Sequence, residues 1–260
     1  MPLAGGRTNL VWRVDGAGPA LVLKLYRLAA SNPLFRNDPV LEAVCLAALE
    51  GSGLAPRLRA QGESDGYRWV LYEHASGTCW QRDPAPVARL LRDLHRRAPA
   101  SALPLGPDGS ADLARQTRTL IALCPEEDRA GLLALAPGGE VPPARRRVPI
   151  HGDPVPGNIL TGPGGLCLID WQCPAFGDPA EDLALFLSPG MQHVYRGAPL
   201  SAAERAEFLA AYGDPVAVQR YAGLRPWFGW RMTAYCLWRD RQGAADYHEA
   251  YRLERADLAG

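Results

Sequence analysis

The stretch HGDPVPGNIL (residues 151–160), followed by LCLIDW (166–171), carries the densest chemical signal in the sequence. It places a carboxylate, Asp153, five residues before an amide, Asn158, and puts a second carboxylate, Asp170, at the end of an apolar segment. Phosphoryl transfer uses these three groups: one carboxylate accepts the proton of a hydroxyl, while an amide oxygen and a second carboxylate hold Mg²⁺ against nucleotide phosphates. The sequence therefore predicts Asp153 as the catalytic residue and Asn158 and Asp170 as metal ligands. Because phosphoryl transfer depends mainly on positioning, we expect little need for a raised pKa at Asp153.

A second signal comes from the basic residues. Lys24 is the only lysine, and all other strongly basic side chains are arginines. It lies in the apolar run ALVLKLY (residues 20–26), which is typical of a buried strand. A surface lysine extending its stem along apolar neighbours is the ordinary alternative. Its uniqueness and position instead favour a contact with phosphate.

These pieces together resemble the aminoglycoside phosphotransferase and choline kinase superfamily, the small-molecule relatives of protein kinases. The spacing from Asp153 to Asn158 equals that of the kinase catalytic loop, with Gly152 where protein kinases have arginine. The dipeptide Asp170-Trp171 stands where protein kinases have Asp-Phe-Gly. The motif at 151–158 is most similar to that of bacterial choline kinases, since antibiotic kinases usually carry Leu-His where this chain has Pro-Val. The match extends in order over nearly the whole chain.

The resemblance implies the remaining nucleotide contacts. Lys24 would contact the α- and β-phosphates of ATP and pair with Glu42 on the following helix, with Glu50 as a competing partner. The segment GGRTN (residues 5–9), including Thr8 and Asn9, resembles the family's nucleotide loop, and the strand before it would be shortened to Pro2-Leu3-Ala4. The carbonyl of Glu73 and the amide of Ala75 would hold adenine. The segments GDP (177–179) and DLA (182–184) resemble the family's post-catalytic signature, and His151 is interpreted as a structural residue of the loop.

The implied fold is an α+β, protein-kinase-like arrangement of two lobes. Residues 1–76 would form a small nucleotide-binding lobe rich in antiparallel strands, and residues 77–260 a larger helical lobe with the catalytic loop and acceptor site. Local patterns agree with this division. Strand-like runs at 10–14 and 20–25 flank a turn, a helix capped by Asp38 runs to Gly51, and a further strand spans 67–74. Segments 84–97, 112–136 and 180–258 are predicted to be mostly helical, with breaks at 189–190, 197–199 and 213–215.

Composition narrows the functional classes. The 28 basic and 28 acidic residues balance, so no global field favours nucleic acid or an anionic membrane. Six cysteines are scattered without metal-site spacing and are interpreted as reduced thiols. No apolar stretch is long enough to span a bilayer, and we expect a cytoplasmic enzyme. The run Arg145-Arg146-Arg147 is interpreted as a solvated face.

The acceptor is the least determined feature of the sequence. Trp227, Trp230 and Trp238 share one helical face, and Tyr221, Phe228 and Tyr235 recur on another. Such stripes are commonly core packing, yet choline kinases line their acceptor pocket with rings from this region, and rings attract quaternary ammonium groups. Glu181, Asp214 and Asp240 would add charge complementarity to a cation.

Three functional hypotheses remain. The first is an ATP- and Mg²⁺-dependent kinase acting on a small, cationic alcohol of the choline, ethanolamine or thiamine class. The second is an aminoglycoside or sugar-hydroxyl phosphotransferase. The third is a nucleotide-binding pseudokinase with a regulatory role, which the intact set of Lys24, Asp153, Asn158 and Asp170 argues against. A protein kinase is disfavoured because no long activation loop ending in Ala-Pro-Glu follows Asp170. The oligomeric state is not predicted.

Overall fold

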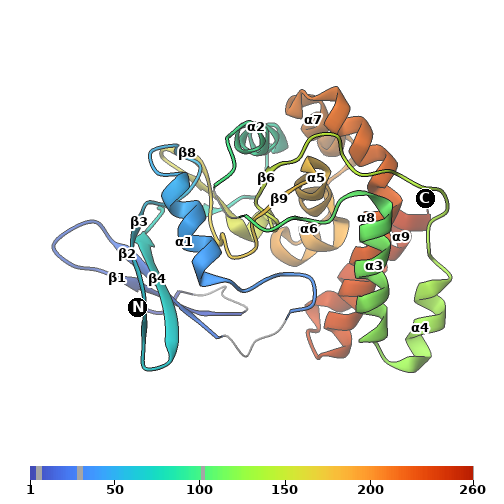
Figure 1. Cartoon of the computed structure of the whole chain (residues 1–260), viewed down its shortest axis with the longest axis horizontal. Coiled ribbons are helices and arrows are strands. Elements are labelled where there is room, and N and C mark those ends of the chain that lie inside the picture. Colours follow the sequence, from blue (N-terminus) through green and yellow to red (C-terminus); the bar gives the residue numbers. More distant parts are fainter. Residues whose placement is uncertain (4–7, 28–31, 101–102, 260) are drawn as a thin grey trace.

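The computed structural model of the chain describes residues 1–3, 8–27, 32–100 and 103–259. Most of the predicted nucleotide loop, Gly5 to Arg7, lies outside the described residues. The amino-terminal part forms an antiparallel sheet and the carboxy-terminal part is mainly helical, so the α+β, protein-kinase-like fold is confirmed (Figure 1). The proposed boundary between residues 76 and 77 stays a prediction.

The first sheet has four strands in the order β1-β2-β4-β3. Strands β1 (Leu10–Val14) and β2 (Leu21–Tyr26) pair as the predicted hairpin, and β2 also pairs with β4 (Tyr67–Glu73). The outer strand β3 (Leu58–Ser64) pairs with β4 and is not predicted by the pattern, because its sequence LRAQGES is largely polar. Helix α1 (Pro39–Ala48) lies beside the sheet and begins as predicted at Asp38, whose side chain accepts bonds from the amides of residues 40 and 41.

Short strands carry the predicted catalytic segment. A three-stranded sheet has the order β5-β7-β8, formed by Thr78–Cys79, Ile159–Gly162 and Gly165–Leu168. A two-stranded ladder joins β6 (Val148–Ile150) to β9 (Ala175–Gly177), and a single 3₁₀ turn covers Pro156–Asn158. Since β4 belongs to the first sheet and β5 to the second, residues 74–77 connect the two sheets.

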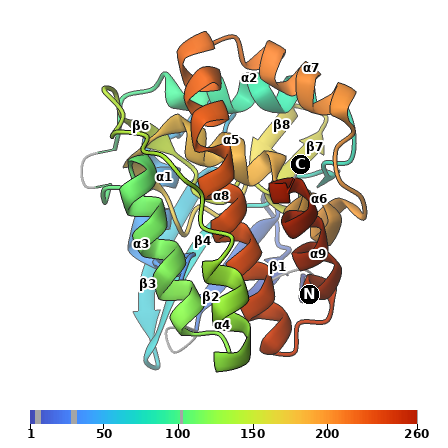
Figure 2. The ribbon, with the colours of Figure 1, turned by 90° about the vertical axis from the view of Figure 1, so that its right-hand side faces the viewer.

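Eight helices complete the described part of the chain after β5: α2 (Pro84–His95), α3 (Gly109–Ala122), α4 (Glu126–Leu133), α5 (Pro179–Leu187), α6 (Pro189–Arg196), α7 (Ala202–Tyr212), α8 (Pro215–Arg241) and α9 (Asp246–Ala259). The long helix α8 runs between α3 and α9 (Figure 2). The predicted breaks fall where one helix ends and the next begins.

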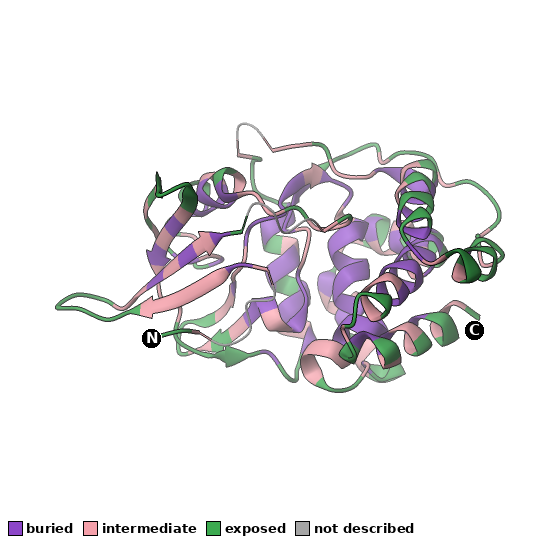
Figure 3. Ribbon diagram, turned by 90° about the horizontal axis from the view of Figure 1, so that it is seen from below, coloured by how far each residue is buried: buried purple, intermediate pink, exposed green. Residues whose placement is uncertain are grey.

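Most of the buried residues lie in this helical part, around α5 and α8 (Figure 3). Helix α5 is buried along nearly its whole length, and α8 contributes a continuous buried run from residue 230 to 237. Apolar burial of this extent is the main stabilising contribution to folding. No helix among the described residues combines the length and apolar character needed to cross a membrane.

Candidate active site

The site is built around the ammonium of Lys24. Lys24 lies on β2, opposite Val11 and Val70 in the neighbouring strands, and its side chain lies on the buried face of an alternating strand. Its Nζ lies 2.7 Å from Oε2 of Glu42 and also donates a hydrogen bond to Asp170. The predicted pair between Lys24 and Glu42 is thus present, and Glu50 instead pairs with Arg57 on the surface.

Both partners hold Lys24 in its charged form. Burial would lower the pKa of the Lys24 ammonium, but the carboxylates of Asp170 and Glu42 outweigh that effect and raise its pKa. The hydroxyl of Tyr26 also donates to Glu42, which fixes this carboxylate from a second side. The side chain of Asp170 is 34% exposed and that of Lys24 only 4%. Solvent therefore reaches this ion pair from the side of Asp170.

Strand pairing brings Asn158 and Asp170 together. Ile159 on β7 lies opposite Leu168 on β8, and the amide of Ile169 donates to the carbonyl of Asn158 at 2.9 Å. Asp170 follows directly with a positive φ of 65°, a left-handed conformation that aspartate tolerates better than most residues. The turn after β8 therefore places the Asp170 carboxylate beside the loop that carries Asn158.

Asp153 is bonded directly to Asn158. The amide Nδ2 of Asn158 donates to the Asp153 carbonyl at 2.9 Å and to the Asp153 carboxylate at 3.2 Å. Burial and the nearby Asp170 carboxylate raise the pKa of Asp153 to about 8, against the opposing hydrogen bond from Asn158. This differs from the sequence-based expectation, because the spacing of residues does not reveal how closely the two carboxylates approach each other.

A buried carboxylate, Asp182, is hydrogen-bonded to the backbone of the catalytic loop. It accepts hydrogen bonds from the amides of His151 and Gly152 at 2.8 and 2.9 Å, and from Nε2 of His95 at 3.0 Å. Burial would raise the pKa of Asp182, but the bonds and charges of His95 and His151 hold it below its usual value. The sequence places Asp182 in a signature segment without giving it this role.

Two further features fix the loop. The amide of Asp153 donates to Nδ1 of His151 at 3.2 Å, so the His151 proton lies on Nε2, which faces the Ile169 carbonyl at 3.0 Å. Burial lowers the pKa of His151, which favours the neutral ring, and the two hydrogen bonds agree with its interpretation as a structural residue. Gly152 has a φ of +80°, and a Cβ there would lie 2.1 Å from the carbonyl oxygen of Cys173. Only glycine fits this position.

The residues fit a magnesium ion. The bonds made by Nδ2 of Asn158 direct its amide oxygen away from Asp153, and Asp170 offers an exposed carboxylate. Within the described residues, no three His, Cys, Asp or Glu side chains converge into a complete protein site for a metal. Mg²⁺ characteristically binds through one or two carboxylates together with substrate phosphates and water. Asn158 and Asp170 match that pattern.

The side chain of Asn9 is engaged within the fold, and its nucleotide contact stays a prediction. Its side chain is buried and donates to Gln172 at 2.9 Å and to Asn37 at 2.7 Å, while its oxygen accepts from the amide of Arg27 at 3.1 Å. These bonds occupy the amide, so Asn9 joins the first sheet to the segment after Asp170. Thr8 is half-buried. Its nucleotide contact stays a prediction, as do those of the Glu73 carbonyl and the Ala75 amide.

Two of the three predicted acceptor tryptophans lie in the core. Trp230 is 0% exposed, and its indole nitrogen donates to the carbonyl of Leu132 on α4 at 2.7 Å. Trp227 is also buried and packs edge-to-face on Trp230 with a centroid distance of 6.2 Å. Their burial favours the core-packing alternative that the sequence left open for these two residues.

A second group of rings, two of them from the carboxy-terminal part of α8, is only partly indicated by the sequence. The ring of Tyr235 lies 5.2 Å from that of Phe35 and 5.9 Å from those of Trp238 and Tyr247. The Tyr235 hydroxyl accepts a bond from Asn32 at 2.9 Å. We call these four rings the aromatic cluster. Burial, with a smaller contribution from Tyr247, raises the pKa of the Tyr235 hydroxyl well above its usual value.

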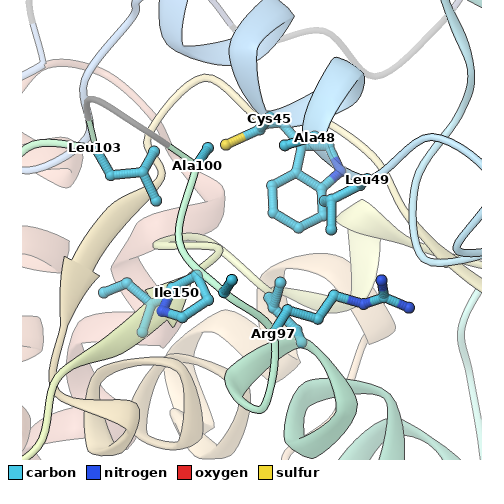
Figure 4. Close-up of a pocket in the computed structure, with 11 residues that line it drawn as sticks. Cys45, Ala48, Leu49, Arg97, Ala100, Leu103 and Ile150 are labelled. Atoms are coloured by element: carbon cyan, nitrogen blue, oxygen red, sulfur yellow. The ribbon is translucent and has the colours of Figure 1, made fainter.

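Two cavities formed by described residues have neither Asp153, Asn158 nor Asp170 in their lining. One, of about 360 Å³, lies behind α1 and is lined mainly by apolar side chains, among them Cys45, Leu49 and Ile150 (Figure 4). Burial raises the pKa of the Cys45 thiol to about 12, so this cavity offers no reactive thiolate. The site is therefore defined by its converging side chains.

Comparison with known proteins agrees with this geometry. The family model described as the phosphotransferase enzyme family matches residues 1–227. A spectinomycin phosphotransferase in complex with ADP and spectinomycin is 15% identical, covers 98% of this chain and 88% of that chain, and gives a TM-score of 0.61. A choline/ethanolamine kinase family protein from Mesorhizobium loti is 19% identical, covers 97% and 85%, and also gives 0.61. An aminoglycoside-3'-phosphotransferase of type VIII is 23% identical, covers 84% and 88%, and gives 0.54.

At these identities the solved structures show a shared fold. No curated protein matches the chain by sequence. The fold and the cluster of Lys24, Glu42, Asp153, Asn158 and Asp170 define a phosphotransferase of the protein-kinase-like class. The chain belongs to the phosphotransferase enzyme family.

Proposed function

We propose that the protein is an ATP- and Mg²⁺-dependent kinase that transfers the γ-phosphoryl group to a hydroxyl of a small molecule. The observation that carries this proposal is the ion pair between Lys24 and Asp170, since it joins the predicted phosphate-binding cation to the predicted metal ligand. The intact set of side chains disfavours the pseudokinase hypothesis.

Each residue then has a role in the transfer. Lys24 binds the α- and β-phosphates, and Glu42 fixes its direction. Asn158 and Asp170 hold Mg²⁺, which supplies positive charge to the phosphate oxygens when it is bound. Asp153 orients the acceptor hydroxyl and takes its proton. Asp182 and His151 keep Asp153 in place through backbone hydrogen bonds.

For the acceptor, our first candidate is a small cationic alcohol of the choline, ethanolamine or thiamine class. The aromatic cluster supports it, because four rings gather in one place and each favourable contact with a quaternary ammonium contributes about 0.5–2 kcal/mol. Two of the acids expected to complement a cation are engaged elsewhere. Glu181 pairs with the buried Arg231, and Asp214 caps the far end of α8.

A sugar or aminoglycoside hydroxyl is the second candidate, and one observation favours it. The guanidinium of Arg239 already lies 5.1 Å from the ring centroid of Tyr247 and 5.8 Å from that of Trp238. Because the Arg239 guanidinium already occupies these rings, a cationic acceptor would gain less binding energy from them. An uncharged acceptor that presents hydroxyl groups would not compete with this guanidinium.

An acceptor panel tests the proposal. ATP consumption is measured with Mg²⁺ and choline, ethanolamine, thiamine or kanamycin, and product phosphorylation is followed by mass spectrometry. Turnover of one class identifies the acceptor chemistry. Measurable ATP binding without turnover of any small alcohol would favour the pseudokinase hypothesis instead.

A further inference from the structure

The second cavity has a volume of about 510 Å³, and its lining contains none of the residues of the predicted reaction site. It is formed by the end of α2, the segment before β6, and the start of α8. Five arginines line it: Arg92 and Arg96 from α2, Arg145 and Arg146 from the segment before β6, and Arg220 from α8. We call it the arginine cavity. Ligand pockets for small molecules commonly have volumes of about 300–1,000 Å³.

The charge of this cavity is largely uncompensated. Among the described residues, Arg96, Arg145 and Arg146 form no ion pair with a carboxylate, whereas their neighbour Arg147 pairs with Asp108 at 3.1 Å. The arginine run is therefore divided: its third member stabilises the fold, and its first two members line the cavity. All three arginines are exposed, as the interpretation of a solvated face expects, and the first two also line the cavity.

Arg92 adds a buried donor without a partner. Its Nε has no hydrogen-bond partner, and the Asp93 carboxylate lies 3.7 Å from it, beyond hydrogen-bond distance. The guanidinium reaches the end of α7, where a Cβ built on Gly213 would lie 3.2 Å from its Nη1. A buried donor of this kind loses free energy unless a partner reaches it.

The acids near the cavity do not cancel this charge. Asp214 uses its carboxylate to cap α8, accepting from the amides of Val216 and Ala217 at 3.1 and 3.2 Å. Arg220 also lines the cavity, but Asp108 and Asp178 neutralise it at 3.1 and 2.5 Å. The other four arginines thus face one capping aspartate within the described lining.

We propose that the arginine cavity binds a small molecule that carries a phosphate group. Guanidinium groups present planar pairs of donors that match phosphate oxygens, and they keep their charge at any physiological pH. Val141, Pro142 and Val216 supply an apolar part of the wall that suits the body of an organic phosphate. The phosphate would meet Arg96 and Arg146 at the entrance and Arg92 deeper inside.

The site is separate from the predicted reaction site but is connected to it by hydrogen bonds. His95 and Tyr212 form part of the cavity wall, and the two side chains are bonded to each other at 2.8 Å. His95 also contacts Asp182 at 3.0 Å, the residue that anchors the catalytic loop. A ligand in the cavity therefore contacts the side chains that support Asp182.

Calorimetric titration with inorganic pyrophosphate in Mg²⁺-free buffer at fixed ionic strength tests the proposal. The double variant Arg96→Gln/Arg146→Gln should bind at least tenfold more weakly than the wild type. Its control, Arg82→Gln/Arg89→Gln, removes the same charge from exposed positions outside the cavity and should bind like the wild type. Lys24→Gln, which alters the predicted reaction site, should also bind like the wild type.

Three results would overturn the proposal. Equal weakening in both double variants would show a bulk charge effect, and loss confined to Lys24→Gln would assign the pyrophosphate to the reaction site. If the wild type does not bind pyrophosphate at millimolar concentration, the cavity is not a phosphate-binding site. Thermal melting of each variant verifies its fold, and the single change Arg146→Gln, at an exposed residue, provides the same comparison with the smallest perturbation.

Discussion

Lys24 forms an ion pair with Asp170, a residue 146 positions further along the chain. The pair connects the four-stranded sheet to the segment after β8, and the second partner of the same ammonium, Glu42, belongs to α1. One cation thus balances two carboxylates that come from different parts of the chain. Nucleotide phosphates and a metal ion would share these charges when they bind.

Replacing Lys24 with methionine should remove both phosphate binding and this charge balance. Charge-assisted hydrogen bonds contribute about 1.5–3 kcal/mol, so we expect kcat/KM for ATP to fall roughly 10- to 100-fold or more. Leaving Glu42 and Asp170 without their cation should also lower the free energy of unfolding by about 3–5 kcal/mol. Steady-state kinetics and denaturant unfolding measure the two effects. The control Arg57→Met removes an exposed ion pair with Glu50 and should change neither. An unaltered KM for ATP in Lys24→Met would contradict the assignment.

Asp182 should act as a positioning residue. Asp182→Ala removes the acceptor for the amides of His151 and Gly152, so Asp153 loses its fixed place. Because small displacements at a reacting centre cost about 100-fold in rate, we expect kcat to fall by that order while the ATP dissociation constant stays within about threefold. Asp108→Ala, at a buried carboxylate paired with Arg147 and Arg220, is the control and should lower stability without this kcat effect. If kcat falls equally in Asp182→Ala and Asp108→Ala, Asp182 has no specific role in positioning Asp153.

The two faces of α8 should respond differently to truncation. Trp230→Ala should lower the free energy of unfolding by about 3–5 kcal/mol, because it leaves a cavity beneath α4, and the KM for the acceptor should not change. Tyr235→Leu should raise the acceptor KM, since this ring contacts the other three rings of the aromatic cluster proposed to bind the acceptor. Kinetics with the accepted substrate and thermal melting separate the effects. If the acceptor KM rises in Trp230→Ala and not in Tyr235→Leu, the acceptor instead binds on the face of α8 that carries Trp230.

Glu254 should make the protein less stable as the pH rises. Burial raises the pKa of this carboxyl to about 7, although Ser188 and the amide of Gly190 donate hydrogen bonds to it. Between the unfolded-state pKa of about 4.3 and this value, the folded state binds more protons, so the free energy of unfolding decreases with increasing pH. Glu254→Gln should abolish this slope and stabilise the protein at pH 8 by about 2–3 kcal/mol. Urea unfolding at pH 5 and pH 8 measures it. Parallel pH profiles for the two proteins would exclude the effect.

Features set by local sequence could be predicted. The motif of residues 151–158 and the apolar run around Lys24 indicate where the catalytic loop and the second strand lie, and Asp38 marks the start of α1. The pair of Lys24 with Glu42 follows from the resemblance to the family. Each of these depends on short spacings, turn residues or a helix cap, which the sequence displays directly.

Features set by distant contacts could not be predicted. The amide of Asn9 bonds to Gln172, 163 positions away, and no local pattern indicates that partner. For a related reason, the sequence does not show which of Trp230 and Tyr235 packs in the core and which lies at the proposed acceptor site. Helix α8 is buried on several sides, against α3, α5 and α9, so helical periodicity alone does not tell which ring faces the core and which faces the site.

The most direct test of the account is a comparison of phosphoryl transfer and ATP binding in Asp153→Asn and the wild type. The account predicts that Asp153→Asn binds ATP with Mg²⁺ like the wild type but transfers phosphate to the accepted alcohol at less than about one hundredth of its rate, because the hydroxyl loses its proton acceptor. A wild-type transfer rate in Asp153→Asn would contradict the assignment of the reaction to this site.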